Sequence, residues 1–488
     1  MPRTLAVHPS HRASLSTALE RNGFLTQGDL AVHLEIAAST VSNFFRGVRV
    51  SVSKFEAISE ALNLDPHVLI LEKGKGVGTP PPEPGDLSGA EALQASFFSY
   101  DSVWVGRQRL VTELSQMLRG TQRLLLLVGM AGIGKTALGE RLCWELAQAP
   151  ETCPSILRLN FDRQNPNPDF VRAAQTLLEA ADQWIPSEES TNPEALGQRL
   201  INLLQSSPYL VVIDSLEEVL QGNAEEGWSE FQDPHFLSFF TQVLSRPSFA
   251  STVLVTSQEL PAPILAMGTR YQNFWHCQLL QGLKETEYLD LFAKAGLSLD
   301  SIQVREYIQR IGQAYEGHPL ALRVIAGEMG DGPFFGQVEV YWQRYGSEIE
   351  AVERALAEAQ EGVVVGADDR WRLDRFTRTL RRNVRERLEQ TLERLRRDLR
   401  SAYLLLCEAS VYRCGVPESF WLSHLDYWNV SPEDQEQALD ILRDRFLVEE
   451  VVQGQEVLVR QHHLIRSVGL DHLRRWDEEE LDSEKREK

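Results

Sequence analysis

The sequence contains few cysteines and no long apolar run, and each absence narrows the class of protein. Only five of the 488 residues are cysteines, and no two form a C-x-x-C pair, so structural disulfides and a cysteine-bound zinc ion are not expected. No apolar stretch reaches the length of about 18 residues that a membrane-spanning helix needs. The amino terminus has no secretory signal pattern. We therefore expect a cytoplasmic protein in a reducing compartment, with no membrane partner.

A surplus of positive charge is also missing. The chain has 49 basic and 70 acidic side chains, which gives a formal net charge of −21 at pH 7. This charge argues against indiscriminate binding of nucleic acid over the whole surface, but it is compatible with one local basic surface. Hydrophobic residues make up 43% of the chain, which is ample for the cores of several domains.

The most informative stretch that is present is residues 129–137, GMAGIGKTA, which fit the pattern G-x-x-x-x-G-K-[ST]. An apolar run, 124–128, precedes it, and a helical pattern of leucines follows it. This strand–loop–helix context is the one that a phosphate-binding loop requires. The backbone N–H groups of the loop would surround the β- and α-phosphates of a nucleotide, at the positive end of the following helix.

Two side chains of this loop have specific predicted roles. Lys135 would neutralise oxygens of the β- and γ-phosphates, which makes it both a binding and a catalytic candidate, and Thr136 would offer its hydroxyl to Mg²⁺. The predicted cofactors are therefore ATP or ADP with Mg²⁺. The predicted nucleotide contacts of the loop are Gly129, Met130, Ala131, Gly132, Ile133, Gly134, Lys135, Thr136 and Ala137.

A second nucleotide element is the apolar run 209–214, YLVVID, which ends in Asp214. An acid at the carboxyl end of a buried strand lies where open α/β sheets bind ligands, so Asp214 is predicted to hold Mg²⁺, directly or through water. Three residues further on, Glu217 could orient or deprotonate the attacking water, and Glu218 is the alternative. Both glutamates could instead be the solvated start of a helix, where negative charge is favourable.

Further motifs follow an order that resembles the STAND class of switch ATPases, the NB-ARC and NACHT group that includes plant resistance proteins and apoptosis scaffolds. Residues 104–108, WVGRQ, resemble the entry motif of that group. Residues 317–322, GHPLAL, resemble its G-L-P-L-A-L motif, and residues 461–466, QHHLIR, resemble its M-H-D-L-I-R motif. Together with the phosphate-binding loop and the strand acid, the resemblance covers about residues 100–475.

The resemblance implies additional nucleotide contacts. The backbone of Val105 and Gly106 would cradle the adenine, Pro319 would pack on the adenine side of the nucleotide, Leu320 would be a further nucleotide contact, and His462 would sense ADP. The chain also departs from the pattern of the group. Ser215 replaces a second aspartate, which makes this region similar to the NACHT form. Gln258 stands where an arginine usually senses the γ-phosphate, which implies slow Mg²⁺-dependent hydrolysis or another arginine in its place.

The amino-terminal region has the pattern of two short helices joined by a turn. Residues 25–47, LTQGDLAVHLEIAASTVSNFFRG, carry apolar faces before and after a turn at Ile36 and Ala37. The pattern is similar to DNA-binding domains of the phage-repressor type. That resemblance implies contacts to DNA through residues 25–50. Base edges would meet Ser39, Ser42 and Asn43, and phosphates would meet Thr40 and Arg46.

A competing interpretation of this region is a protein-interaction effector. Ala38 stands where such domains often carry a base-reading glutamine. In residues 1–70 six basic side chains balance six acidic ones, whereas DNA-binding modules usually show a positive surplus.

Residues 370–400 contain twelve arginines and five acids. They could form a nucleic-acid surface, or a helix that joins two domains. The apolar residues that recur every three or four positions favour the joining helix.

The predicted fold class is multidomain α and α/β, with an amino-terminal all-helical helix-turn-helix, a central P-loop parallel α/β sheet, a helical domain and a carboxyl-terminal winged helix. The predicted boundaries are 10–72 for the helix-turn-helix effector domain, 73–95 for a flexible linker, 96–283 for the P-loop domain, 284–370 for the helical, ARC-like domain, 371–400 for a basic connecting helix, 401–475 for the winged helix and 476–488 for an acidic disordered tail.

The predicted function is an ATP/ADP-operated switch that couples nucleotide exchange to domain opening and self-association in the ATP state, as a signal-responsive transcription regulator. Two alternatives remain. One is an oligomerising signalling or defence scaffold whose amino-terminal unit binds a protein. The other is a plain P-loop ATPase that acts on a substrate. The upstream sensor or protein partner that would activate the switch stays unknown.

Overall fold

The computed structural model describes residues 4–8, 11–24, 26–34, 36–47, 50–64, 66–70, 104–148, 155–161, 169–223, 228–268, 270–361, 375–453 and 456–487. The chain divides into two compact units. One, here called the sheet unit, contains residues 107–282 and 358–381. The other, here called the helical unit, contains residues 1–106, 283–357 and 382–488. The predicted linker 73–95 lies outside the described residues.

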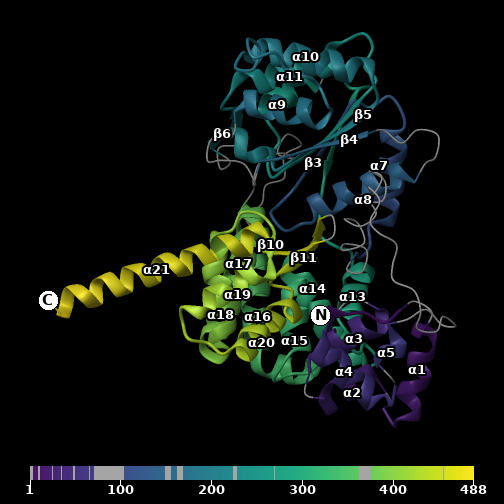
Figure 1. The fold of residues 1–488 in the computed structure, drawn as a ribbon, viewed down its shortest axis with the longest axis vertical. Helices are drawn as coiled ribbons and strands as arrows, with labels where there is room; N and C mark the ends of the chain where they lie inside the picture. Colours follow the sequence, from purple (N-terminus) through teal and green to yellow (C-terminus); the bar gives the residue numbers. More distant parts are fainter. Residues whose placement is uncertain are drawn as a thin grey trace. The chain divides into compact units, whose positions relative to one another are not determined.

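The sheet unit is built on five parallel strands in the order β4-β5-β8-β3-β9. Three of them, β3, β4 and β5, are labelled in Figure 1. The strands are β3 (Leu124–Val128), β4 (Ser155–Asn160), β5 (Tyr209–Asp214), β8 (Thr252–Ser257) and β9 (Trp275–Leu279). The predicted parallel α/β sheet is therefore confirmed, and the apolar runs 124–128 and 209–214 form its strands β3 and β5. The fifth strand, β9, was not predicted.

Helices cover both faces of this sheet, which explains why β3 is apolar at every position. Leu124 and Leu126 contribute to a core with α9 (Phe170–Ala180), α10 (Pro193–Ser206) and α11 (Pro234–Ser245). On the other face, Gly139 of α8 approaches Leu254 so closely that a Cβ would lie 3.1 Å from the leucine Cδ2. The remaining elements are α7 (Gln108–Leu118), α8 (Lys135–Ala147), η3 (Leu216–Val219), the β6–β7 hairpin (Leu220–Asn223 and Trp228–Phe231) and α12 (Ala262–Gly268).

The helical unit begins with short helices around an apolar core of their own. They are α1 (Arg12–Arg21), α2 (Gln27–Leu34), α3 (Ala38–Arg46), α4 (Val52–Ala61) and α5 (Pro66–Leu69), with an antiparallel pair of short strands, β1 (Thr4–Leu5) and β2 (Val50–Ser51). The apolar faces read from the sequence are buried, with Leu30, Val41 and Phe44 at 0% exposure. Helix α3 ends at Gly47, whose φ of 69° places it in the left-handed region that glycine adopts without strain.

The rest of the helical unit contains longer helices and a small antiparallel sheet in the order β10-β12-β11. Trp421, Leu439 and Val468 are among the side chains that form its core. The elements are α13 (Glu285–Lys294), α14 (Ile302–Ala314), α15 (Pro319–Gly330), α16 (Val338–Glu361), α17 (Arg375–Asp398), α18 (Arg400–Glu408), η5 (Ala409–Val411), β10 (Val416–Pro417), α19 (Glu418–Asp426), α20 (Pro432–Asp444), β11 (Glu449–Gln453), β12 (Glu456–Arg460) and α21 (His463–Glu487).

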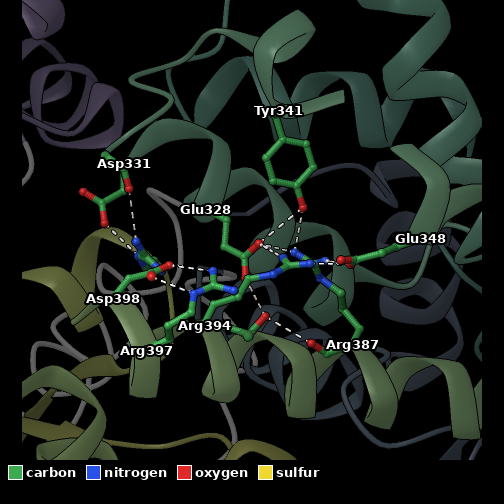
Figure 2. Close-up of polar contacts among 11 residues, drawn as sticks. Glu328, Asp331, Tyr341, Glu348, Arg387, Arg394, Arg397 and Asp398 are labelled. Atoms are coloured by element: carbon green, nitrogen blue, oxygen red, sulfur yellow. Dashed lines mark hydrogen bonds and ion pairs between the residues drawn. The ribbon is translucent and has the colours of Figure 1, made fainter. Parts of the chain in front are cut away.

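The arginine-rich helix α17 is held by a buried ionic network (Figure 2). Glu328 of α15 accepts hydrogen bonds from Arg387 and, at 2.6 Å, from both Arg394 and Thr391, all three on α17. Tyr341 of α16 accepts a further bond from Arg387 at 2.7 Å. Leu380, Val384, Leu388, Leu392 and Leu395 of α17 are also buried, which supports the joining-helix interpretation, and the nucleic-acid alternative stays untested.

The prediction of a disordered tail at 476–488 is wrong for most of that segment. Helix α21 continues to Glu487. The sequence after Gly469 contains no glycine or proline, and its glutamate, lysine and arginine residues are good helix formers, so nothing in it ends the helix. High charge was read as disorder, although it is equally compatible with a solvated helix.

None of the described helices combines the length and apolarity that crossing a bilayer would require. The cysteines at 143, 277, 407 and 414 are free thiols.

Candidate nucleotide-binding site

The phosphate-binding loop connects β3 to α8, as the sequence predicts. Gly132 and Gly134 have φ angles of 75° and 94°, so the loop needs glycine at both positions. Gly129 is also confined, because a Cβ there would lie 3.0 Å from the carbonyl oxygen of Leu280. The chain therefore turns into α8 with its first N–H groups at the positive end of the helix, where anions bind.

Lys135 is the first residue of α8 and is only 7% exposed. Its ammonium group donates to the carbonyl oxygens of Gly129 at 2.9 Å and Met130 at 3.0 Å. The lysine thus lies folded over the loop, with its charge beside the backbone that would enclose the phosphates. A phosphate oxygen would offer this ammonium a stronger, charged acceptor than a carbonyl does.

Asp214 is surrounded by side chains from three other elements. Its carboxylate, at the end of β5, accepts hydrogen bonds from Thr136 at 2.9 Å, Thr256 at 2.5 Å and Asn160 at 3.1 Å. These donors come from α8 and from the carboxyl ends of β8 and β4. Strand β8 lies between β3 and β5, so the hydroxyl of Thr136 reaches across it to the acid. The predicted pair Thr136 and Asp214 is therefore brought together.

The residues around Asp214 fit a magnesium ion. Mg²⁺ prefers hard oxygen ligands, and the threonine hydroxyl and the carboxylate supply them. Asn160 adds an acceptor, because its Oδ1 is buried and has no hydrogen-bond partner among the described atoms. A hydrated cation would satisfy such an oxygen. Asn160 and Thr256 were not predicted as site residues, although both are polar groups at the carboxyl ends of strands.

Glu217 and Glu218 differ clearly in their surroundings. Ser215 adopts a left-handed φ of 63° and turns the chain from β5 into η3. The carboxylate of Glu217 then accepts a hydrogen bond from the backbone N–H of Gln258 at 3.1 Å, at the end of β8. Glu217 is half-buried, whereas Glu218 is exposed. The geometry favours Glu217 as the group that would act on a water molecule.

Arg107 has a positioning role that the sequence analysis missed. Its guanidinium donates to the carbonyl oxygen of Ile133, inside the phosphate-binding loop, and to that of Gln281, both at 2.8 Å. It thereby joins the loop to the chain that follows β9. The sequence did contain a pattern that could have pointed to this residue, because Arg107 belongs to the WVGRQ motif at 104–108.

The other predicted nucleotide contacts belong to the helical unit, so their approach to the nucleotide stays a prediction. Gly106 has a φ of 65° and Val105 precedes it. Pro319 is the first residue of α15, and Leu320 is 5% exposed in the apolar core. His462 precedes α21 and accepts a hydrogen bond from the N–H of Leu464 at 3.2 Å.

The predicted DNA contacts lie on α3 and touch other parts of the helical unit. Thr40 donates to Asp444 of α20, and both Ser42 and Arg46 donate to the backbone carbonyl of Lys294 in α13. Asn43 is half-buried, and the side chain of Ser39 lies outside the described part of the chain.

Residues 103–255 match the AAA ATPase domain family. A WD repeat-containing protein of Nostoc sp. is 26% identical over 401 residues, which cover 77% of this chain and 27% of that protein. The chain thus spans about a quarter of the length of this curated relative.

Solved structures with a similar fold include a STAND protein with a tetratricopeptide repeat sensor from Pyrococcus horikoshii, at 13% identity and a TM-score of 0.43, covering 75% of this chain and 42% of that one. They also include Cdc6p of Pyrobaculum aerophilum, at 13% identity and a TM-score of 0.33, covering 77% of this chain and 98% of that one. At these TM-scores the likenesses add nothing to the geometry of the site.

Proposed function

We propose that this protein is an ATP/ADP-operated molecular switch of the STAND type with slow Mg²⁺-dependent ATPase activity. The observation that carries the proposal is the convergence of the phosphate-binding loop with Asp214, whose carboxylate is 2.9 Å from the hydroxyl of Thr136. The match of residues 103–255 to the AAA ATPase domain supports nucleotide binding. The resemblance of the later motifs to the NB-ARC and NACHT group supports the finer assignment.

In the proposed reaction each side chain has one task. The N–H groups of the loop and Lys135 hold the phosphates and offset their negative charge. Thr136 and Asp214 would hold Mg²⁺, which would offset negative charge on the phosphates. Glu217 orients a water molecule and accepts its proton. Gln258 presents its backbone N–H to Glu217, and its amide side chain carries no charge for the γ-phosphate, which is consistent with slow turnover.

In the proposed switch, ADP favours a closed arrangement in which Val105, Gly106, Pro319, Leu320 and His462 contact the nucleotide. Exchange for ATP removes part of this preference and favours opening and self-association. A nucleotide can shift such an equilibrium only through unequal affinity for the two states. The signal that drives exchange would come from a sensor or partner protein.

The test is the nucleotide content of the purified protein. We expect wild type to release stoichiometric ADP on denaturation and Lys135→Ala to release none, because the loop would lose the cation that offsets the phosphate charge. Lys284→Ala is a matched control, since Lys284 is exposed. Normal nucleotide affinity in Lys135→Ala would contradict the assignment of the loop.

The output of the switch is proposed to be DNA binding through a helix-turn-helix formed by α2 and α3. The buried apolar faces of both helices support that fold, and the hydroxyl, amide and guanidinium groups of α3 are those that contact DNA. The balanced charge of residues 1–70 favours the alternative, a protein partner for these helices. A salt-dependent shift of a DNA duplex by the full chain distinguishes the two outputs.

A further inference from the structure

The polar face of α3 is occupied by other segments of the helical unit. Thr40 is 2% exposed, and its hydroxyl donates to a carboxylate oxygen of Asp444 at 2.6 Å. The other oxygen of Asp444 lies 2.9 Å from the ammonium of Lys54, on α4. Asp440, one turn earlier on α20, lies 3.6 Å from the same ammonium. One hydroxyl and one ammonium group are therefore satisfied by the carboxylates of α20.

The other end of α3 is held by a helix terminus. Lys294 is the last residue of α13, and its carbonyl oxygen accepts a hydrogen bond from Arg46 at 2.8 Å and from Ser42 at 3.3 Å. Carbonyl groups in the last turn of a helix carry partial negative charge, so a guanidinium is favourable there. Arg46 and Ser42 are thus engaged by a group that partly resembles an anion.

These contacts belong to a continuous interface. Helix α3 also packs against α15, and Gly336, in the turn after α15, is so close that a Cβ there would lie 3.6 Å from the Cβ of Ala38. The residues that Thr40 and Lys54 contact are 404 and 390 positions away in the sequence. The interface therefore joins α3 and α4 to α13, α15 and α20.

The donors on this surface are the groups with which proteins bind the phosphates of nucleic acids: two hydroxyls, a guanidinium and an ammonium. We propose that Asp440, Asp444 and the carbonyl of Lys294, here called the acidic cover, occupy the phosphate-binding face of α3 and α4. DNA and the acidic cover then compete for the same donors. That the competing ligand is DNA rests on the proposed function. That the acidic cover occupies these donors rests on the contacts alone.

The acidic cover is attached to the helix that carries the GHPLAL motif. Arg445 follows Asp444 directly and forms a 2.7 Å ion pair with Asp331, the residue after α15. Helix α15 approaches this point so closely that a Cβ on Gly327 would lie 2.6 Å from the Cα of Arg445. A displacement of α15 therefore displaces Asp444, which links the nucleotide motif at the start of α15 to the cover at its end.

The test uses the full chain with the substitution Asp444→Asn, which keeps the shape of the side chain and removes its charge. We expect amide hydrogen exchange in residues 38–46 to accelerate at least about tenfold. If the substitution weakens the contact between α3 and the acidic cover by about 1.4 kcal/mol, the fraction of molecules in which α3 is uncovered rises by that factor. Affinity for a fluorescent DNA duplex of mixed sequence should rise by a similar factor. Glu436→Gln is the control, because Glu436 is an exposed residue of α20 and its substitution also removes one negative charge. It should change neither the exchange rate nor the affinity for DNA.

A second variant keeps the test decisive if Asp444→Asn fails to fold. Lys54→Met removes the partner cation from α4 and should accelerate exchange in residues 38–46 in the same way. Faster exchange without DNA binding in Asp444→Asn would support the cover and contradict the DNA-binding output, whereas Lys54→Met, which also removes a proposed phosphate donor, tests only the cover. If amide exchange in residues 38–46 is unchanged in every variant that folds, the proposal of an acidic cover is wrong, whether or not the affinity for the DNA duplex changes.

Discussion

The hydrogen-bond donors around Asp214 are all neutral. Thr136, Thr256 and Asn160 satisfy its oxygens without cancelling the charge, and the carboxylate is only 9% exposed. Arg158 of β4 interacts electrostatically with Asp214, but its ion pair is with Glu140. A buried carboxylate of this kind is favourable beside a divalent cation, which is why a magnesium site is a better physical account than a structural one.

A prediction at the residue scale concerns Glu217. Glu217→Gln keeps the hydrogen bond from the N–H of Gln258 but removes the base, so the rate of ATP hydrolysis should fall roughly 10²- to 10⁴-fold. Affinity for ATP and ADP should stay unchanged, because the proposed role of Glu217 is toward the attacking water and not toward the nucleotide. The measurement is phosphate release in single turnover, beside nucleotide affinity. Glu218→Gln is the matched control, and an equal loss of rate in that variant would contradict the assignment.

The sequence predicts those residues of the site that lie close together in one motif, and it misses those that only the folded sheet brings together. The loop, Asp214 and Glu217 lie in contiguous motifs, so their pattern was readable. Asn160 and Thr256 join the site because β4 and β8 flank β5 in the sheet. Strand order follows from tertiary packing, and no short window of the sequence contains it. For the same reason the contact between Thr40 and Asp444 could not be predicted.

At the scale of elements, three helices of the helical unit meet at Glu328 (Figure 2). Its carboxylate is 3% exposed and contacts Arg387, Arg394 and Thr391 of α17. Burial alone would raise the pKa of Glu328, but the two guanidinium groups outweigh it and hold that pKa at about 2. The carboxylate therefore stays charged, and it fastens α15 to α17 at neutral pH.

We predict that Glu328→Gln lowers the free energy of unfolding by about 3–5 kcal/mol, because it leaves the buried guanidinium groups of Arg387 and Arg394 with only Glu348 as a carboxylate partner. The native pKa of about 2 lies below the ordinary value of 4.5, so the stabilisation is complete above about pH 4.5 and is lost as the pH falls toward 2. The difference between wild type and variant should therefore shrink with acid in urea unfolding. Glu386→Gln, in an exposed pair with Arg382, should cost less than about 1 kcal/mol.

Helices and strands could be predicted where apolar residues recur at regular intervals or form a continuous run. Strands β3 and β5 were predicted from continuous apolar runs, but β9 contains His276 and Gln278 and lacks such a run. The strands of the β6–β7 hairpin are only four residues each and include Gly222, which weakens any strand signal. Helix α21 was truncated in the prediction because net charge was weighed above helix propensity.

At the scale of the whole molecule, the predicted nucleotide contacts are divided between the two compact units. The loop and Asp214 belong to the sheet unit, whereas Pro319 and His462 belong to the helical unit. A nucleotide that contacts both sets would stabilise both units at once. A nucleotide that contacts only the loop and Asp214 would leave the stability of the helical unit unchanged. Ligand-induced stabilisation of the helical unit therefore distinguishes a switch from a simple ATPase.

We predict that ADP with Mg²⁺ slows amide exchange both in α8 and in α15. At a free ADP concentration of 100 times Kd, linkage gives about 2.7 kcal/mol, which raises the midpoint of thermal unfolding by roughly 5–10 °C for a unit of this size. Lys135→Ala should abolish both effects. Protection confined to α8 would mean that the nucleotide does not reach the helical unit. The GHPLAL motif would then be a packing element, and the acidic cover would have to be released by something other than nucleotide exchange.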